Sequence, residues 1–417
     1  MNESLGVVFV GLNGAVTSTI VAGVALMKKG LAPRNGMLTD GPLAKMLDVV
    51  PLEKLVFAGW DLRNESVYDA ALSHGVVPRY TLEQVKEELQ AVKPWPAVVS
   101  SKFLHSMLGK HIIGADTFRD EIKILSDNIT AFKKAHNLDR VVMVNLASTE
   151  KFTEVSDIHK TVPAFEAALN ASDARISPAM KYLYVAIKMG VAHVNFTPSL
   201  TKIPALEKLS EMSGVPICGE DGKTGQTMMK TVLAPAFAIR EFKVEGWYST
   251  NILGNNDGLV LNDPESNKTK IQSKIGVIDD ILGYKVPNHQ VHIHYYPPRG
   301  DAKEAWDNID IEGFLGERMQ IKLNFLCKDS ILAAPLVIDL FRLMDVAMRN
   351  GDAGIQRQMS LFFKSPYATE GERPMHDLFK QYGLLEKWAK TVGTRVADKD
   401  KPVSVVTKVA GGRLATG

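Results

Sequence analysis

Two loops rich in glycine and small polar residues could hold phosphate groups. Residues Gly11–Thr19 (GLNGAVTST) follow an apolar, strand-like run and precede a helix-like one, which is where a dinucleotide pyrophosphate meets backbone N–H groups. Asn13 and Thr17 stand where the usual fingerprint has glycine, so an ordinary tight turn is the alternative, although Asn can adopt a left-handed backbone. Residues Gly219–Gln226 (GEDGKTGQ) lack the spacing of a Walker loop, which disfavours nucleoside triphosphate hydrolysis. They could still present N–H groups to a phosphate monoester, or form a solvated turn.

Carboxylate and amide side chains near these loops could bind hydroxyl groups. Asp61 ends the apolar run KLVFAGWD and could accept a hydrogen bond from a ribose hydroxyl. It lies 47 residues after Gly14 rather than the usual ~20, so this role requires an insertion, and a solvated strand end is the alternative. Residues Gly254–Gly258 (GNNDG) are typical of a hairpin turn. Their two amides and one carboxylate could also bind the hydroxyls of a sugar.

Several lysines could move a proton or stabilise an oxyanion. Lys270 and Lys274 are four residues apart and would share one face of a helix. Lys303 stands in the run GDAK, and Lys364 stands in the run FFKSP. A lysine taken alone is more typical of a solvated surface. Lys364 is the exception, because apolar residues precede it, and a desolvated lysine has a lowered pKa and can transfer protons near neutral pH.

No spacing of side chains in the sequence points to a particular metal. His292 and His294 alternate along a strand-like run, but no cysteine or carboxylate lies at ligand spacing, so we expect a half-buried strand pair. We interpret the acidic residues beside apolar runs as helix caps or surface charges; these are Asp279, Asp280 and Asp329. The two cysteines, Cys218 and Cys327, fit a reducing cytoplasm, although they could pair.

The composition is that of a globular chain with balanced charge. The 417 residues include 49 Lys and Arg against 47 Asp and Glu, with 45% apolar and 23% charged residues. These values exclude intrinsic disorder and a disulfide scaffold. The charges are spread along the chain, so we expect neither nucleic-acid binding nor a basic membrane patch. The N-terminus does not resemble a signal peptide, and no apolar run reaches the ~20 residues of a membrane span, so we expect a soluble cytoplasmic protein.

Strands alternating with helices would position these loops. Continuous apolar runs predict buried strands, and periodic runs predict helices. The predicted strands are 5–11, 54–61, 140–148 and 190–199, and the predicted helices are 19–30, 117–137 and one opened by a capping box at Thr81–Gln84. This alternation over the first half of the chain predicts an α/β fold with a Rossmann-like, doubly wound parallel sheet.

Beyond residue 227 the pattern changes. Segments 242–253 and 290–298 alternate apolar with polar residues, which is typical of a sheet with one solvated or interface face. Helical patterns return at 332–349 and 373–391. We therefore expect residues 228–333 to form an inserted α+β domain for catalysis and oligomerisation. Residues 1–227 plus 334–417 would form the dinucleotide-binding domain.

Taken in order along the chain, these segments resemble the motifs of the myo-inositol-1-phosphate synthase family. The resemblance covers about residues 5–390 and departs from the family pattern at Asn13, Thr17, Glu220, Gly222 and Lys328. The matching segments are Gly59–Leu62 (GWDL), Gly219–Thr227 against the family's GDDxKSGQT, Asn251–Gly258 against NHLGNNDG, Lys270–Lys274 before Val277–Asp280, Gly300–Lys303, Cys327–Pro335 and Phe363–Pro366.

The resemblance implies an NAD-dependent enzyme that converts D-glucose 6-phosphate to 1L-myo-inositol 1-phosphate. NAD would oxidise carbon 5 of the open-chain sugar, carbon 6 would then lose a proton and attack the carbon 1 aldehyde, and the ketone would be reduced again. Enolate and alkoxide charges need close cations, which lysines supply. The alternatives are a dehydrogenase that releases NADH, a cyclase acting on another sugar phosphate, and a non-catalytic relative that binds sugar phosphates.

The resemblance also implies roles for single residues. Lys270 would move the proton of the carbon 5 hydroxyl, Lys364 would act near enolisation, and Lys274 and Lys303 would stabilise oxyanions, with Asp221, Asp257 and Asp329 tuning these lysines. Substrate would be held by Thr224, Gly225, Gln226, Asn251, Leu253, Asn255 and Asn256. NAD would be held by Gly11, Asn13, Gly14, Ala15, Val16, Asp61, Ala147 and Ser148. A homotetramer built through the inserted sheet is implied, and a divalent or monovalent cation is left open.

Overall fold

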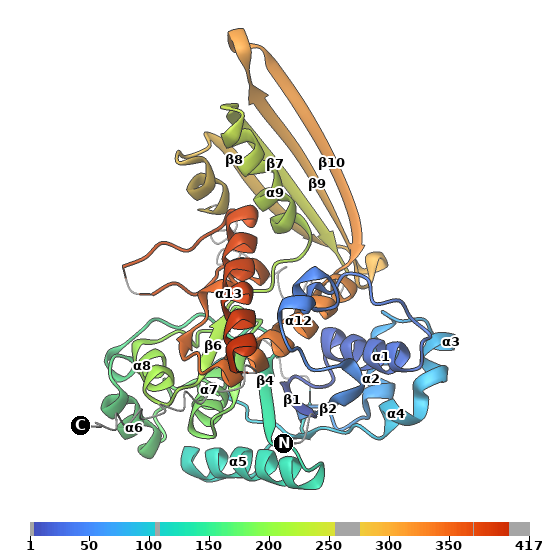
Figure 1. Cartoon of the computed structure of the whole chain (residues 1–417), viewed down its shortest axis with the longest axis vertical. Helices are drawn as coiled ribbons and strands as arrows, with labels where there is room; N and C mark the ends of the chain where they lie inside the picture. Colours follow the sequence, from blue (N-terminus) through green and yellow to red (C-terminus); the bar gives the residue numbers. More distant parts are fainter. Residues whose placement is uncertain (1–3, 105–108, 255–275, 370, 400–417) are drawn as a thin grey trace, which may run out of the picture.

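The computed structural model describes residues 4–104, 109–254, 276–369 and 371–399, which form two sheets (Figure 1). The larger sheet has seven strands in the order β11-β6-β5-β4-β1-β2-β3, and its strand pairs are parallel. Its order reverses between β1 and β4, so the sheet is doubly wound, as predicted. The strands are β1 (Leu5–Val10), β2 (Leu55–Asp61), β3 (Trp95–Pro96), β4 (Arg140–Asn145), β5 (Ala192–Asn195), β6 (Pro216–Gly219) and β11 (Gly354–Ile355).

Helices connect these strands and cover both faces of the sheet. Alternate residues of β1 point to opposite faces, so Val7 and Phe9 belong to the core with α1 and α12, whereas Val8 and Val10 belong to the core with α5 and α7. The helices are α1 (Ala15–Lys28), α2 (Val67–His74), α3 (Arg79–Leu82), α4 (Lys86–Gln90), α5 (Phe118–Ala135), α6 (Val162–Asn170), α7 (Pro178–Lys188), α8 (Pro204–Met212), α9 (Gly225–Ile239), α12 (Asp329–Asn350) and α13 (Leu378–Lys399).

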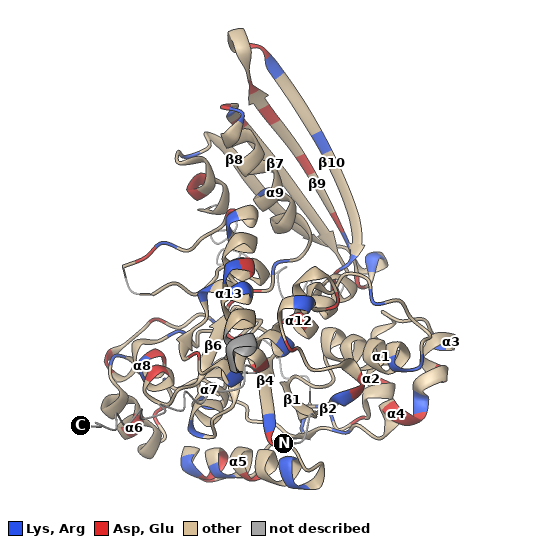
Figure 2. Ribbon diagram, in the orientation of Figure 1, with Lys and Arg blue, Asp and Glu red and all other residues tan. Residues whose placement is uncertain are grey.

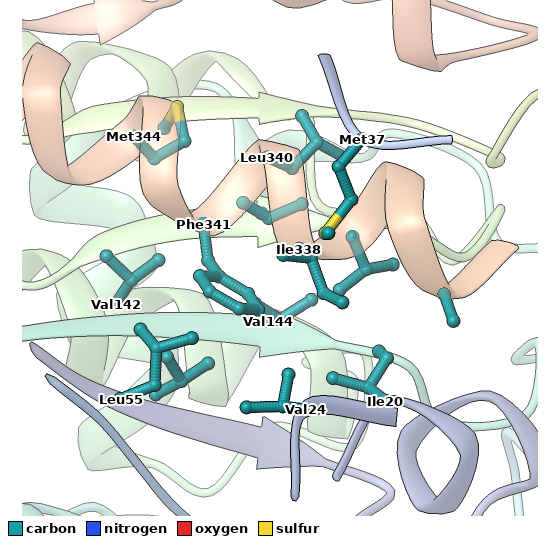
Figure 3. Close-up of a cluster of buried hydrophobic side chains, with 14 of the residues drawn as sticks. Ile20, Val24, Met37, Leu55, Val142, Val144, Ile338, Leu340, Phe341 and Met344 are labelled. Carbon is teal, nitrogen blue, oxygen red and sulfur yellow. The ribbon is translucent and has the colours of Figure 1, made fainter. Parts of the chain in front are cut away.

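Helix α12 lies in the middle of the larger core although it comes late in the chain. Figure 3 shows Ile338 and Phe341 of α12 next to Val144 of β4, and Val24 of α1 belongs to the same core. Phe341 is fully buried, and burying such a side chain contributes on the order of 1.5–3 kcal/mol. The segment before β2 is fastened to the same helix, because Asp339 accepts hydrogen bonds from the backbone N–H groups of Leu38 and Thr39, each at 2.8 Å.

The smaller sheet has four strands in the order β10-β9-β7-β8. They are β7 (Lys243–Leu253), β8 (Asn288–Tyr295), β9 (Ala302–Glu312) and β10 (Arg318–Lys328). One face packs against α9 and the helical residues 276–282, with Phe237, Trp247, Ile278 and Ile309 in this core. Trp306 and Tyr248, on the other face, are 49% and 47% exposed. In Figure 2, β9 carries acidic segments and β10 carries basic ones.

The structure confirms the predicted elements around the loops and corrects one of them. The capping box predicted at Thr81–Gln84 is wrong, because the helix there begins at Arg79, after Pro78, and has no side-chain cap. Cys218 and Cys327 are both free. The boundaries of the inserted domain at residues 228 and 333 stay a prediction. The first falls inside α9, which begins at Gly225, and the second falls inside α12, which begins at Asp329. Among the described residues, no helix is both long enough and apolar enough to cross a bilayer.

Candidate active site

A cavity of about 660 Å³ lies beyond the carboxyl ends of β1, β2 and β4, where it also meets β7 and β9. This is the edge at which parallel α/β sheets bind ligands. It is lined by Gly11, Gly14, Ala15, Val16, Asp61, Ala147, Ser148, Asp221, Thr224, Asn251, Leu253, Lys303, Asp329 and Lys364, all of which were predicted for the site.

The other predicted site residues fall into two groups. Asn13, Gly225 and Gln226 are buried next to lining residues, and they are not part of the cavity wall itself. The remaining ones lie outside the described residues, so the structure does not place them; they are Lys270, Lys274, Asn255, Asn256 and Asp257.

Gly11 makes the first loop possible. Its φ is +91°, and a Cβ there would lie 3.0 Å from the backbone of Ala147. The loop then leads through Gly14 into α1, whose first turn begins at Ala15 and faces the cavity. The first N–H groups of a helix have no partner within the helix, so this wall offers donors to a pyrophosphate, as the NAD prediction requires.

Asn13 does not supply the left-handed backbone of this loop. It is not among the residues with a positive φ, so the left-handed turn falls at Gly11. The Asn13 backbone N–H donates to Asp61 Oδ2 at 2.8 Å, and its side-chain amide donates to the carbonyls of Arg63 and Glu65 at 3.1 and 2.8 Å. Asp61 also accepts from the Arg63 N–H at 2.9 Å through Oδ1. Asn13 and Asp61 therefore fasten the end of β2 to the glycine loop.

The second predicted loop is fixed by a segment far along the chain. The Asp221 carbonyl accepts from the Lys364 N–H at 2.7 Å, and the Lys223 N–H donates to the Phe362 carbonyl at 2.8 Å. Gly222 has no room for a side chain, because a Cβ there would lie 2.0 Å from the Phe196 ring. This contact explains why position 222 is a glycine. The pairing brings Lys364 to the cavity.

Two lysine–aspartate pairs face this cavity. Lys364 Nζ donates to Asp221 Oδ1 at 2.8 Å, and these side chains are only 13% and 11% exposed. Lys303 Nζ lies 3.6 Å from Asp329 Oδ2. The Thr224 hydroxyl donates to the other oxygen of Asp329 at 2.7 Å. A half-buried ammonium next to a carboxylate can stabilise an oxyanion or exchange a proton with it.

Sequence reasoning missed several titratable residues in the cavity wall, namely Arg63, His74, Glu150, Tyr182 and Asp301. Glu150 is the one whose pKa moves into the neutral range. Burial raises its pKa to about 7, against the lowering effects of hydrogen bonds from Ser177 and from the Ala179 N–H. The Ala179 N–H bond to Glu150 Oε1 is 2.8 Å long. The sequence signal that could have identified Glu150 is its position soon after β4, two residues beyond Ser148. A carboxyl group that titrates near neutral pH in a cleft is a functional candidate.

The described residues contain no group of three or more His, Cys, Asp and Glu side chains that could hold a metal ion. His292 and His294 lie on β8 with their rings stacked at 6.3 Å between centroids.

Comparisons with known proteins agree over most of the chain. Residues 5–390 match a family model described as myo-inositol-1-phosphate synthase. The chain is 44% identical over 416 residues to inositol-3-phosphate synthase 1 of Bacteroides thetaiotaomicron, covering 95% of this chain and 96% of that protein. It is 30% identical over 452 residues to inositol-3-phosphate synthase of Saccharomyces cerevisiae, covering 93% and 84%.

A solved structure has the same fold. The crystal structure of inositol-3-phosphate synthase from Caenorhabditis elegans matches with a TM-score of 0.88 and 24% identity, covering 99% of this chain and 90% of that chain.

Proposed function

The chain belongs to the myo-inositol-1-phosphate synthase family, and we infer that it converts D-glucose 6-phosphate to 1L-myo-inositol 1-phosphate with NAD, the first step of inositol biosynthesis. The observation that carries this function is the shared cavity. The glycine loop, the Lys364–Asp221 pair and the Lys303–Asp329 pair all contribute to its wall.

We propose that NAD lies along the glycine loop and the end of β4. Gly11, Gly14, Ala15 and Val16 would hold its phosphates, and Asp61 a ribose hydroxyl, on the wall described above. Bound NAD supplies reversible oxidation of a carbon of the sugar. Because the oxidation is reversed at the end of the cycle, we expect no net production of NADH.

The residues of this chain would handle charge and protons. Lys364 would act at the enolisation step, with Asp221 holding its ammonium in place at 2.8 Å. Lys303 would stabilise an oxyanion, with Asp329 and Thr224 fixing its position. We propose Lys270 and Lys274 as further members of this cluster, and Asp257, Asn255 and Asn256 as their neighbours, from the motif alone. A divalent or monovalent cation stays part of the proposal, without assigned ligands.

We also propose a cytoplasmic homotetramer. The two free cysteines suit a reducing compartment. The exposed aromatic face of the four-stranded sheet, with Tyr248 and Trp306, supports an interface through residues 228–333, since large exposed apolar patches mark contact surfaces.

The alternative is a related NAD-dependent cyclase or dehydrogenase acting on another sugar phosphate. The deciding experiment incubates the protein with NAD and glucose 6-phosphate, identifies the product by phosphorus NMR, and follows NADH by absorbance. We expect an inositol monophosphate and no accumulating NADH. Stoichiometric NADH would favour the dehydrogenase, and an unchanged glucose 6-phosphate signal would favour another sugar phosphate.

A further inference from the structure

A row of buried polar side chains leads from the cavity wall into the space between α9 and the four-stranded sheet. Asn251 is in the wall, Gln226 lies behind it, and Asp307 lies behind Gln226. These three side chains are 0%, 2% and 3% exposed. Asp307 was not predicted as a site residue, and it does not line the cavity.

Strand geometry puts these groups together. Residues two apart on a strand point to the same face, so Trp247, Ser249 and Asn251 of β7 share the face that packs against α9. The register of β7 with β9 sets Asp307 opposite Ser249. Gln226 is in the first turn of α9 and reaches the same face.

The carboxylate of Asp307 is surrounded by donors. Its Oδ1 accepts from the Trp247 indole N–H at 2.7 Å and from the Ser249 hydroxyl at 2.6 Å. The Gln226 amide nitrogen donates to both oxygens, at 3.2 and 3.1 Å. An indole N–H can only donate, so Asp307 must act as an acceptor here.

This arrangement determines which way two amides point. Because Asp307 accepts, Gln226 turns its Nε2 toward it and its Oε1 toward Asn251. Oε1 can only accept, so Asn251 donates its Nδ2 to Gln226, at 2.6 Å. The Asn251 Oδ1 is then left over: it is buried and has no hydrogen-bond partner among the described residues. A buried acceptor without a donor is unfavourable, so a bound group that donates would be stabilised there.

We propose that Asp307 is a positioning residue that makes Asn251 an obligate hydrogen-bond acceptor for one hydroxyl of the sugar phosphate. This inference rests on the proposed function. A ketone cannot donate a hydrogen bond, so the hydroxyl at Asn251 is one that stays a hydroxyl through the reaction. Asn251 thereby selects for a hydroxyl at one carbon that the chemistry leaves untouched.

The test replaces Asp307 by Asn, which keeps the shape but can either donate or accept, so that Gln226 and Asn251 are free to turn over. Binding of glucose 6-phosphate is measured on NADH-loaded protein, which cannot oxidise the sugar. The same measurement is made with three analogues that carry fluorine in place of the hydroxyl at carbon 2, 3 or 4, because fluorine can accept a hydrogen bond weakly and cannot donate one. In the wild type, one analogue should bind at least about tenfold more weakly. In Asp307→Asn the penalty for that analogue, meaning its loss of affinity relative to glucose 6-phosphate, should fall below about threefold. The penalties for the other two analogues should stay as in the wild type.

Asp310→Asn is the matched control, because Asp310 is an exposed carboxylate on the same strand, and it should keep the wild-type pattern. Unchanged penalties in Asp307→Asn, or a wild type that tolerates all three analogues, would overturn the inference. A wild type that binds no glucose 6-phosphate would instead contradict the proposed function. If Asp307→Asn fails to fold, Gln226→Met removes the same orienting hydrogen bonds. This variant should no longer bind the one analogue more weakly than glucose 6-phosphate. If it still does, the inference is wrong.

Discussion

At the scale of the residue, the charge of Lys364 should decide turnover. Lys364→Met removes an ammonium that lies 2.8 Å from Asp221 beside the cavity. Loss of one oxyanion partner costs roughly a hundred- to a thousandfold in rate, so we expect at least that loss in product formation, measured by phosphorus NMR. The substitution also leaves the buried Asp221 carboxylate without its ammonium, which lowers the melting temperature.

A second variant separates the two effects of Lys364→Met. Adding Asp221→Asn removes the buried carboxylate that has lost the Lys364 ammonium, so Lys364→Met/Asp221→Asn should regain melting temperature without regaining turnover. Lys380→Met is the control, because that side chain is 73% exposed. If Lys364→Met kept more than about a third of the wild-type rate, Lys364 would not belong to the reacting site.

The pH dependence of stability should reveal the buried Lys230. Burial lowers its pKa to about 8 from 10.5. Below pH 8 it is charged in both the folded and the unfolded chain, and between pH 8 and 10.5 the unfolded chain binds more protons. Stability contributed by this group therefore rises with pH across that window, by at most about 3 kcal/mol. Urea unfolding from pH 7 to 10.5 should show this rise in the wild type, relative to Lys230→Met.

The exposed lysine Lys322 provides the reference for that measurement. Lys322→Met should follow the wild-type pH profile, because the residue is exposed on β10. Parallel pH profiles for the wild type and Lys230→Met would contradict a lowered pKa at Lys230.

Sequence patterns pointed to residues that line the cavity where a motif surrounds them. They could not show which residues pair with a partner far away in the sequence. Lys364 and Asp221 were both predicted, but they are 143 positions apart, so their pairing could not be read from spacing. Asp307 gave no signal, since its role depends on the strand register that places it opposite Ser249. Asn13 was considered for the turn because Asn can adopt a left-handed backbone; the turn falls at Gly11, and the hydrogen bonds of Asn13 tie β2 to the loop.

At the scale of the element, the turn from β1 into α1 should not tolerate a side chain at Gly11. Gly11→Ala would put a Cβ 3.0 Å from the Ala147 backbone at a φ of +91°, and such strain costs of order 1–3 kcal/mol. We expect a lower melting temperature and NAD binding weakened by at least about tenfold in calorimetry, because the loop must shift.

Gly23→Ala is the matched control inside α1. The nearest atom to its Cβ is Met27 Cε at 4.0 Å, and alanine is favoured over glycine in a helix interior by roughly 0.5–1 kcal/mol. It should therefore stabilise the protein and leave NAD binding unchanged. Equal NAD affinity in Gly11→Ala and Gly23→Ala would show that the glycine loop does not hold the cofactor.

The strands of the larger sheet were predictable because burial on both faces leaves continuous apolar runs, as in β1 and β4. The four-residue β6 and the two-residue β11 were missed, since such short strands have no period to detect. The helix at Arg79–Leu82 was misplaced because Thr81 fits a capping box, whereas Pro78 is where the helix begins.

At the scale of the whole molecule, we expect assembly through the open face of the four-stranded sheet. Trp306 is 49% exposed on that face, so Trp306→Glu would place a charge in the interface of the proposed homotetramer. Light scattering at micromolar concentration should give a tetramer for the wild type and smaller species for Trp306→Glu. Phe314→Glu is the control for an added charge, because Phe314 is 86% exposed in the connection from β9 to β10. A monomeric wild type would contradict the proposed assembly.

The late position of α12 in the chain affects how the protein is made on the ribosome. The larger core closes only when Ile338 and Phe341 reach β4, yet 109 residues separate the end of β6 at Gly219 from the start of α12 at Asp329. Translation at about 5–20 residues per second needs roughly 5–20 s for that stretch. During this interval the part of the apolar face that α12 covers stays exposed, so chaperones that shield such surfaces have a defined window in which to act.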